Sequence, residues 1–196
     1  MTILLLAGSP SALSRSTCLL HHVGKKLAAL GHRYAKLDVR DLPGQALIRA
    51  DFNDAEIKAA LARVKEASAI VIATPVYKAA YSGVLKAFLD LLPQFGLTGK
   101  LVLPLATGGS QSHMLALDYA LRPVLSSLGS RHVLPSIYAT EAQVAWSEQG
   151  SLVLDMSIVA RVQEGVEQLS SSLLTLQKTA SGEFSDVPFS QIRCSV

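Results

Sequence analysis

Short apolar runs alternate with longer segments of helical periodicity along this chain of 196 residues. The first run, ILLLA at residues 3–7, is continuously hydrophobic and ends in Gly-Ser-Pro, which is typical of a strand buried on both faces. The longer segments repeat apolar residues at three- and four-residue spacing, which predicts helices. The pattern predicts strands at 3–7, 33–39, 69–75, 100–109 and 132–140, and helices at 16–31, 54–66, 82–92, 112–128 and 155–178.

Strands that alternate with helices in this way predict an α/β fold, a doubly wound five-stranded parallel sheet with helices on both faces. The expected strand order is 2-1-3-4-5. Residues 1–180 form one domain in this interpretation, and residues 181–196 form a polar C-terminal tail. Two prolines bear on the strands: Pro75 is expected to end the third, and Pro104 removes one hydrogen-bond donor from the fourth.

The composition excludes several classes of function. The net charge is +3 and the 18 basic residues form no cluster, so nucleic-acid binding is not expected. Cys18 and Cys194 are far apart in the sequence, which disfavours a metal site or a dithiol centre, and Cys18 is interpreted as a small core residue on a helix. With no leader pattern and no apolar run of about 18 residues, a cytoplasmic location and no membrane segment are expected. The hydrophobic fraction of 49% suggests that another subunit covers some apolar surface.

Three loops follow the first, third and fourth predicted strands. They read GSPSALSRST, TPVYKAAYSG and TGGSQSH, and they are the most unusual stretches of the sequence. In a doubly wound sheet the ligand binds beyond the carboxyl ends of the strands, at the switch in strand order, where these three loops converge. The sequence therefore predicts one site built from all three.

The first loop has the composition of a phosphate site. It leads from a strand into a helix, so free backbone N–H groups and the positive end of the helix dipole face outward. Ser9, Ser14, Ser16 and Thr17 add hydroxyl donors, and Arg15 adds a fixed charge. A serine-rich turn that merely caps the helix is the alternative. The loop matches neither G-x-x-x-x-G-K-[ST] nor G-x-G-x-x-G, so a terminal monophosphate such as that of FMN is favoured over a nucleotide polyphosphate.

The second and third loops suit a planar ligand. Pro75, Val76 and Tyr77 offer a surface on which an aromatic ring can lie, and Gly108 and Gly109 allow backbone to approach a flat molecule closely. Either loop alone is also compatible with an ordinary surface turn.

These loops resemble those of the flavodoxin-like NAD(P)H-dependent FMN reductases over about the first 140 residues. The segments TPVYKAAYSG, LPLATGG and LDYALRPVL are similar, more narrowly, to the NADPH-dependent FMN reductases of the alkanesulfonate system. In the wider family the second loop often reads P-x-Y-N-x-S-x-x-G-x-L-K-N; here Lys78 and Ala87 replace the two asparagines, which favours the sulfonate branch over chromate or quinone reductases. The resemblance implies binding roles for Ser9, Ser14, Arg15 and Ser16 at the FMN phosphate, Pro75, Val76 and Tyr77 along the isoalloxazine ring, Thr107, Gly108, Gly109 and Ser110 at its pyrimidine edge, and His113 beside flavin or nicotinamide.

The resemblance also implies a reaction. NADPH reduces FMN by hydride transfer, and the reduced flavin passes to a two-component sulfonate monooxygenase that serves sulfur acquisition. Such a transfer requires stacked rings and exclusion of water but no general base, so no catalytic acid or base and no metal ligand are assigned. Lys78 and Arg15 are candidates for the 2′-phosphate of NADPH. The alternatives are an FMN-containing quinone or azo reductase and an electron carrier; carriers are usually acidic, whereas this chain is slightly basic.

Pro123 lies inside the helical pattern HMLALDYALRPVLSSLG. Because proline cannot bond to the carbonyl of Tyr119, four residues earlier, a kink or a π-bulge is expected at Asp118–Tyr119. The resemblance implies a homo-oligomer, a dimer of dimers, and we expect Tyr119 to project into an interface beside the flavin.

Overall fold

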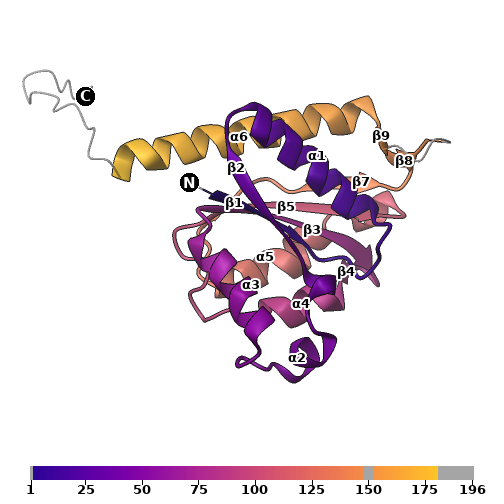
Figure 1. Cartoon of the computed structure of the whole chain (residues 1–196). Coiled ribbons are helices and arrows are strands. Elements are labelled where there is room, and N and C mark those ends of the chain that lie inside the picture. The colour runs from indigo at the N-terminus through magenta and orange to yellow at the C-terminus, as the bar shows by residue number, and fades with distance from the viewer. Residues whose placement is uncertain (1, 148–151, 181–196) are drawn as a thin grey trace, which may run out of the picture.

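A mostly parallel sheet forms the centre of the computed structural model, which describes residues 2–147 and 152–180 (Figure 1). The predicted tail at 181–196 lies outside the described residues. The strands are β1 (Thr2–Ala7), β2 (Arg33–Asp38), β3 (Ala69–Tyr77), β4 (Ala80–Tyr81), β5 (Leu101–Gly108), β6 (His132–Val133), β7 (Ile137–Thr140), β8 (Val144–Trp146) and β9 (Leu152–Leu154). The helices are α1 (Arg15–Ala29), α2 (Gly44–Arg49), α3 (Ala55–Glu66), α4 (Gly83–Leu89), α5 (Arg122–Ser127) and α6 (Met156–Ala180).

The order of the sheet is β2-β1-β3-β5-β6, and β7 also pairs with β5. Since β5 is the fourth predicted strand and β6 and β7 are the two parts of the fifth, the predicted order 2-1-3-4-5 is confirmed. The β1–β3 and β3–β5 pairs are parallel, as a doubly wound fold requires. The sequence did not predict α2 or the antiparallel β8–β9 hairpin.

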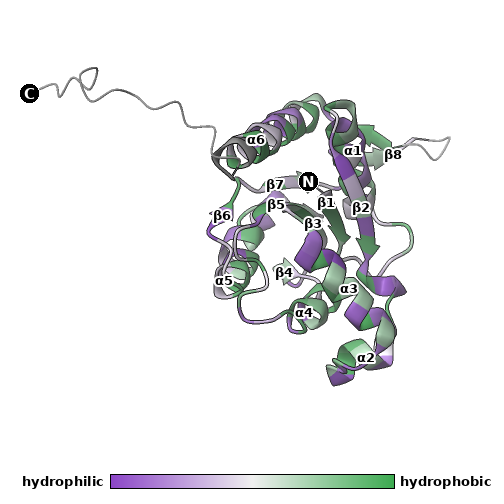
Figure 2. Ribbon diagram, turned by 60° about the vertical axis from the view of Figure 1, so that its left-hand side comes forward, coloured by the Kyte–Doolittle hydropathy of each residue, from purple (hydrophilic) through white to green (hydrophobic). Residues whose placement is uncertain are grey.

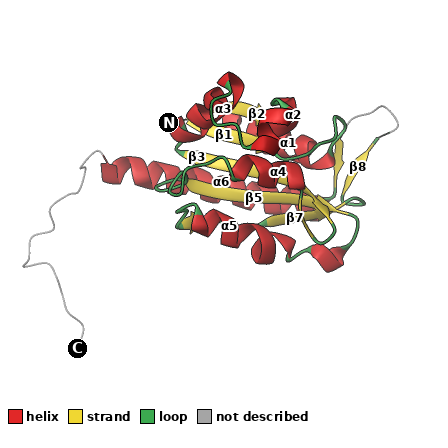
Figure 3. Cartoon of the chain, turned by 90° about the horizontal axis from the view of Figure 1, so that it is seen from below, coloured by secondary structure: helices red, strands yellow, loops and turns green. Residues whose placement is uncertain are grey.

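Alternate residues of the central strands point to opposite faces of the sheet. Ile3 and Leu5 contribute to the core beneath α1 and α6, whereas Leu4 and Leu6 contribute to the core beneath α3, α4 and α5. Along α6 hydrophobic and hydrophilic residues alternate (Figure 2), as expected for a helix with one face on a sheet. Seen from below, α3, α4 and α5 cover one face while α6 lies behind the other (Figure 3).

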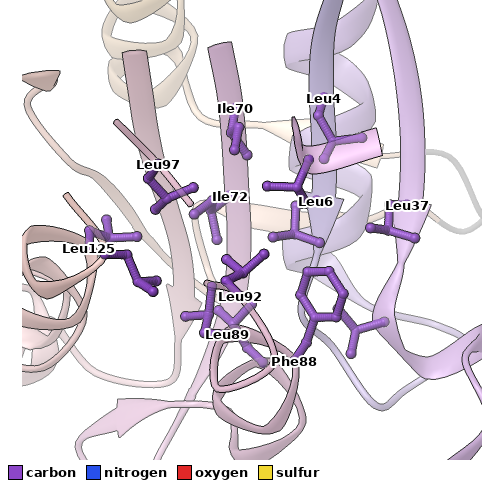
Figure 4. Packing of buried hydrophobic residues seen from close by; sticks show 14 of the residues in the cluster. Leu4, Leu6, Leu37, Ile70, Ile72, Phe88, Leu89, Leu92, Leu97 and Leu125 are labelled. Carbon is purple, nitrogen blue, oxygen red and sulfur yellow. The ribbon is translucent and has the colours of Figure 1, made fainter. Parts of the chain in front are cut away.

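The core under α4 fixes the position of the loop that precedes this helix. Phe88 and Leu89 of α4 are completely or almost completely buried against Leu6 and Ile72 of the sheet (Figure 4). Burying a side chain of this size stabilises the fold by about 1.5–3 kcal/mol. The first turn of α4 is therefore held rigidly at the carboxyl ends of β1 and β3.

Pro104 fits within a central strand because the neighbouring strand is interrupted there. Val102 O accepts from Leu134 N–H, so the even-numbered groups of β5 face the side of β6 and β7. The pairs with β6 end at Val102, and those with β7 begin at Leu105. The N–H group that Pro104 lacks would therefore point to the gap between β6 and β7, where no strand pairs with it. The absence of this donor costs little.

Pro75 does not end the third strand, so that expectation was wrong. The β1–β3 pairs end at Ala7 and Ala73, and therefore Pro75 lies past the last residue of β1. β3 continues to Tyr77 and folds back on β4 through a two-residue turn. Both turn residues have positive φ, 49° at Lys78 and 64° at Ala79, as the turn of a tight hairpin requires.

The helix predicted at 112–128 is broken into three short pieces. Residues Gln111–His113 form a 3₁₀ turn, Leu117–Leu121 form a π-helix, and α5 begins at Arg122. Arg122 N–H donates to Leu117 O, a five-residue spacing that defines the π geometry. We expected Pro123 to cause either a kink or a π-bulge, and the structure has the π geometry.

Candidate FMN and nicotinamide site

The loops after β1, β3 and β5 meet at one edge of the sheet. Residues of all three line a hollow of about 120 Å³, together with the segment after β7. From the predicted set, the hollow is lined by Ser9, Ser14, Arg15, Pro75, Val76, Tyr77, Thr107 and Gly108. The structure thus brings together residues as far apart in the sequence as Ser9 and Glu141.

Ser14 caps α1 at this edge. Its backbone is extended, and its Oγ accepts from Thr17 N–H at 3.3 Å and lies 2.9 Å from Ser16 Oγ. Because the amides of Arg15 and Ser16 are in the first turn of the helix, they have no acceptor within it. The loop therefore caps the helix and also presents free amides, so the two interpretations of its serines are compatible.

Arg15 has an unsatisfied donor in this loop. Its Nε is buried and has no hydrogen-bond partner among the described residues, while Nη1 lies 3.5 Å from Glu141 Oε2. A buried unpaired donor is costly, because the solvent it has lost is not replaced. A phosphate at the start of α1 would supply the missing acceptor, so the residues present fit the terminal group of FMN.

Ser82 ties the second loop to the first. Its amide donates to Thr74 Oγ1 at 3.0 Å, its Oγ accepts from Leu85 N–H at 3.1 Å, and the same hydroxyl donates to Gly8 O. All three side chains, those of Thr74, Ser82 and Leu85, are buried. Since one hydroxyl caps α4 and holds the start of the first loop, the two loops have a fixed relation to each other.

Gly108 and Tyr138 fix the third loop. A Cβ on Gly108 would lie 2.4 Å from Tyr138 Oη, which itself donates to Ser110 O at 2.5 Å. Burial first, and then the nearby Glu141 carboxylate, raise the pKa of the Tyr138 hydroxyl above its usual value, so it remains a donor at neutral pH. The glycine is therefore required by the packing of this hydroxyl.

Four predicted residues do not line the hollow. Ser16 is completely buried and contacts Ser14; Gly109 and Ser110 are exposed beyond the end of β5; His113 is half-buried in the 3₁₀ turn. The Ser110 hydroxyl accepts from Ser112 N–H at 3.2 Å and so caps this turn. Each of these residues is close in sequence to one that lines the hollow. Their contact with flavin stays a prediction.

Sequence reasoning missed Glu141 and the β3–β4 turn. Glu141 follows the fifth strand, which the topology did not place among the converging loops. The turn residues Lys78 and Ala79 carry no glycine or asparagine signal, although both have positive φ. The residue type gave no indication of either feature.

A larger hollow, of about 730 Å³, lies between α3 and the segment that joins α4 to β5. Its lining is mostly apolar, and Lys100 Nζ beside it donates to the carbonyls of Lys65 and Ala67, at 2.8 and 2.6 Å. Both acceptors lie just before β3, so that lysine stabilises the start of this strand. The smaller hollow, with its polar donors at the carboxyl edge, is the candidate site.

Two further features concern metals and membranes. Within residues 2–147 and 152–180, no three His, Cys, Asp or Glu side chains gather so as to hold a metal ion. In the same part of the chain, no helix combines the length and the apolar character needed to span a bilayer.

Cys18, a free thiol on α1, is only half-buried, which corrects its interpretation as a core residue.

The fold and the hollow at its edge define a flavodoxin-like α/β protein suited to a phosphorylated planar cofactor. The model of the NADPH-dependent FMN reductase family matches residues 1–145. The chain is 45% identical over 148 residues to the FMN reductase (NADPH) of Pseudomonas putida KT2440, covering 76% of this chain and 75% of that one. It is 44% identical over 144 residues to the FMN reductase (NADPH) of Escherichia coli K12, covering 74% and 75%.

Solved structures are also similar to this chain. A crystal structure of NADH:FMN oxidoreductase (EMOB) in its apo form has a TM-score of 0.79 at 38% identity, covering 87% of this chain and 89% of that one. A flavodoxin of Streptococcus pneumoniae, at 15% identity and a TM-score of 0.60 with 87% and 98% covered, shares the fold. The chain belongs to the NADPH-dependent FMN reductase family. It is an NAD(P)H-dependent FMN reductase, and the family uses FMN and NADPH.

Proposed function

We propose that this reductase prefers NADPH, releases reduced FMN, and supplies it to a two-component sulfonate monooxygenase for sulfur acquisition in the cytoplasm. The observation that supports the flavin site is the meeting of three separated loops around Arg15, whose buried Nε lacks a partner among the described residues. The likeness of TPVYKAAYSG, LPLATGG and LDYALRPVL to the alkanesulfonate branch supports the proposed physiological role.

The positions of these residues support the proposed binding roles. Ser9, Ser14 and Arg15 would hold the phosphate with the free amides of α1, and Pro75, Val76 and Tyr77 would line the ring. Thr107, Gly108 and the exposed Gly109 and Ser110 would meet the pyrimidine edge, and His113 would lie beside flavin or nicotinamide. When bound, FMN supplies the atom that accepts the hydride. The chain contributes position and exclusion of water, for which none of these residues needs to transfer a proton.

Lys78 is the proposed contact for the 2′-phosphate of NADPH. It is exposed at the β3–β4 turn, next to Tyr77 of the proposed ring surface, so its ammonium group is available to an anionic ligand. Arg15 is the second candidate, although its contact with the FMN phosphate would occupy it. The variant Lys78→Gln is expected to raise the KM for NADPH and leave that for NADH unchanged; equal effects on both would exclude this role.

Arg15→Gln tests the phosphate site. Hydrogen bonds to charged groups contribute about 1.5–3 kcal/mol, so the variant should bind FMN roughly 10- to 100-fold more weakly. Riboflavin, which lacks the phosphate, should bind equally well to both proteins. Titration of flavin fluorescence measures both affinities, and an unchanged affinity for FMN would place the phosphate elsewhere.

The reaction is distinguished from its alternatives by the colour of the protein and its need for free flavin. The proposed reductase loses flavin on gel filtration, and its NADPH oxidation then depends on added FMN. A yellow protein that reduces quinones or azo dyes and is indifferent to added FMN would be the alternative reductase. A yellow protein inert to NADPH would be an electron carrier. Addition of a sulfonate monooxygenase, with sulfite release as readout, tests the proposed partner.

A further inference from the structure

Glu141 extends into the same hollow as the proposed phosphate ligands. Its backbone is fixed there, because its N–H donates to Gly108 O at 3.0 Å and so continues the pairing of β5 with β7. The following turn is tied by Gln143, whose side-chain oxygen accepts from Thr140 N–H at 2.9 Å. Glu141 is the acidic residue among the described residues that line the hollow. An acid held by the sheet at an anion site requires an explanation.

The carboxylate forms a loose ion pair with Arg15. The distance from Nη1 to Oε2 is 3.5 Å, whereas a charge-assisted hydrogen bond is about 2.7–2.9 Å long. The Glu141 side chain is 56% exposed, so the pair is partly solvated and easily separated. Glu141 is thus a counterion of Arg15 that can separate from it.

We propose that Glu141 competes with the FMN phosphate for Arg15, and that this competition keeps the flavin exchangeable. The inference rests on the proposed phosphate site. A phosphate that accepts from the unpartnered Nε of Arg15 shares the charge of the guanidinium with Glu141, which contacts Nη1. The two anions then lie in the same hollow and repel each other. When the flavin leaves, Glu141 stays beside Arg15, so departure does not leave that charge without a counterion. A reductase whose flavin is also a product benefits from such a weakened grip.

The test is the variant Glu141→Gln, which keeps the size of the side chain and removes its charge. Its affinity for oxidised FMN, titrated by flavin fluorescence without NADPH at low ionic strength, should rise roughly three- to tenfold. The dissociation of FMN should slow by a similar factor, and the gain should shrink at high salt. An unchanged or weaker affinity would overturn the proposal, since Glu141 would then merely orient Arg15.

Three controls restrict the interpretation. Riboflavin should bind equally to both proteins; a tighter riboflavin complex would contradict competition with a phosphate. In the Arg15→Gln background, Glu141→Gln should gain less, whereas a full gain would show that Arg15 is not involved. Glu66→Gln removes the same charge from the exposed end of α3, at the opposite edge of the sheet, and should leave FMN affinity unchanged.

The failure of this inference can be told from the failure of the proposed function. A parent protein that reduces FMN while Glu141→Gln binds it no tighter would refute this inference alone. A parent that binds no FMN would refute the proposed function.

Discussion

At the scale of single residues, the candidate site depends on close contacts that leave no room for a larger side chain. Gly108 is a clear instance, because the space a Cβ would need is occupied by Tyr138 Oη at 2.4 Å and approached by Val76 Cβ at 3.3 Å. The hydroxyl cannot move freely, since it donates to Ser110 O. The conformation of the third loop therefore depends on a tyrosine of β7, the strand that pairs with the end of β5.

Gly108→Ala is expected to lower the thermal midpoint by several degrees and to weaken FMN binding, because the new methyl group must displace the Tyr138 hydroxyl. Adding Tyr138→Phe removes the clashing oxygen and should restore part of the lost stability, a non-additive result that a double-mutant cycle measures. Gly109→Ala is the matched stability control, since nothing lies within 4 Å of its Cβ position. Simple additivity of the two substitutions would contradict the proposed packing.

Residue identity alone predicted many of the residues that line the hollow but not its polar connections. The serines and arginine of the first loop and the two glycines of the third could be selected from the sequence, because few other roles explain their density after a buried strand. The role of Ser82 as a link to Gly8, and the approach of Glu141 to Arg15, depend on contacts between distant segments. Local pattern carries no information on such contacts.

At the scale of elements, the loops are positioned by the starts of helices. α1 begins at the first loop with Ser14 as its cap, and α4 begins after the second with Ser82. The strand order could be predicted because alternating strands and helices permit few topologies. The β3–β4 hairpin could not, since Lys78 and Ala79 adopt positive φ without the residues that favour it.

Ser82→Ala removes the cap of α4 and the donor to Gly8 O at once. We expect a loss of about 1–3 kcal/mol in the free energy of unfolding, because a buried carbonyl is left without its partner. Denaturant titration measures the loss. Ser127→Ala, which removes an exposed hydroxyl that donates to Val124 O within α5, should change the stability by less than about 0.5 kcal/mol. Equal effects of the two variants would show that Ser82 is not a structural link.

α1 also makes the stability depend on pH. Burial first, and then nearby lysines, lower the pKa of His22, whose Nε2 is buried without a hydrogen-bond partner among the described residues. Because the folded pKa lies below the unfolded value, the unfolded state binds more protons as pH falls below about 6.5. Stability should therefore be full above that pH and decrease below it, down to the folded pKa. His22→Gln should flatten this part of the thermal midpoint against pH; an unchanged slope would assign it to other groups.

At the scale of the whole molecule, the described surface carries apolar residues that a single chain leaves uncovered. Tyr119 of the π-helix is 78% exposed, and Met114 and Leu115 just before it are each 46% exposed. Exposed apolar groups that cluster along one segment mark interaction surfaces more often than isolated ones. A dimer of dimers that covers this segment remains our proposal, and the outward position of Tyr119 is the geometry it needs.

The proposal predicts that Tyr119→Asp reduces the mass of the assembly measured by analytical ultracentrifugation, since a buried carboxylate at a subunit interface is costly to desolvate. Ile48→Asp provides the matched control, because Ile48 is 85% exposed on α2, away from the π-helix. Its assembly should equal that of the parent protein. If Tyr119→Asp leaves the mass unchanged over the concentration range in which the parent assembles, the π-helix does not lie in the interface. If both variants dissociate, the added charge acts through general repulsion and not through this contact.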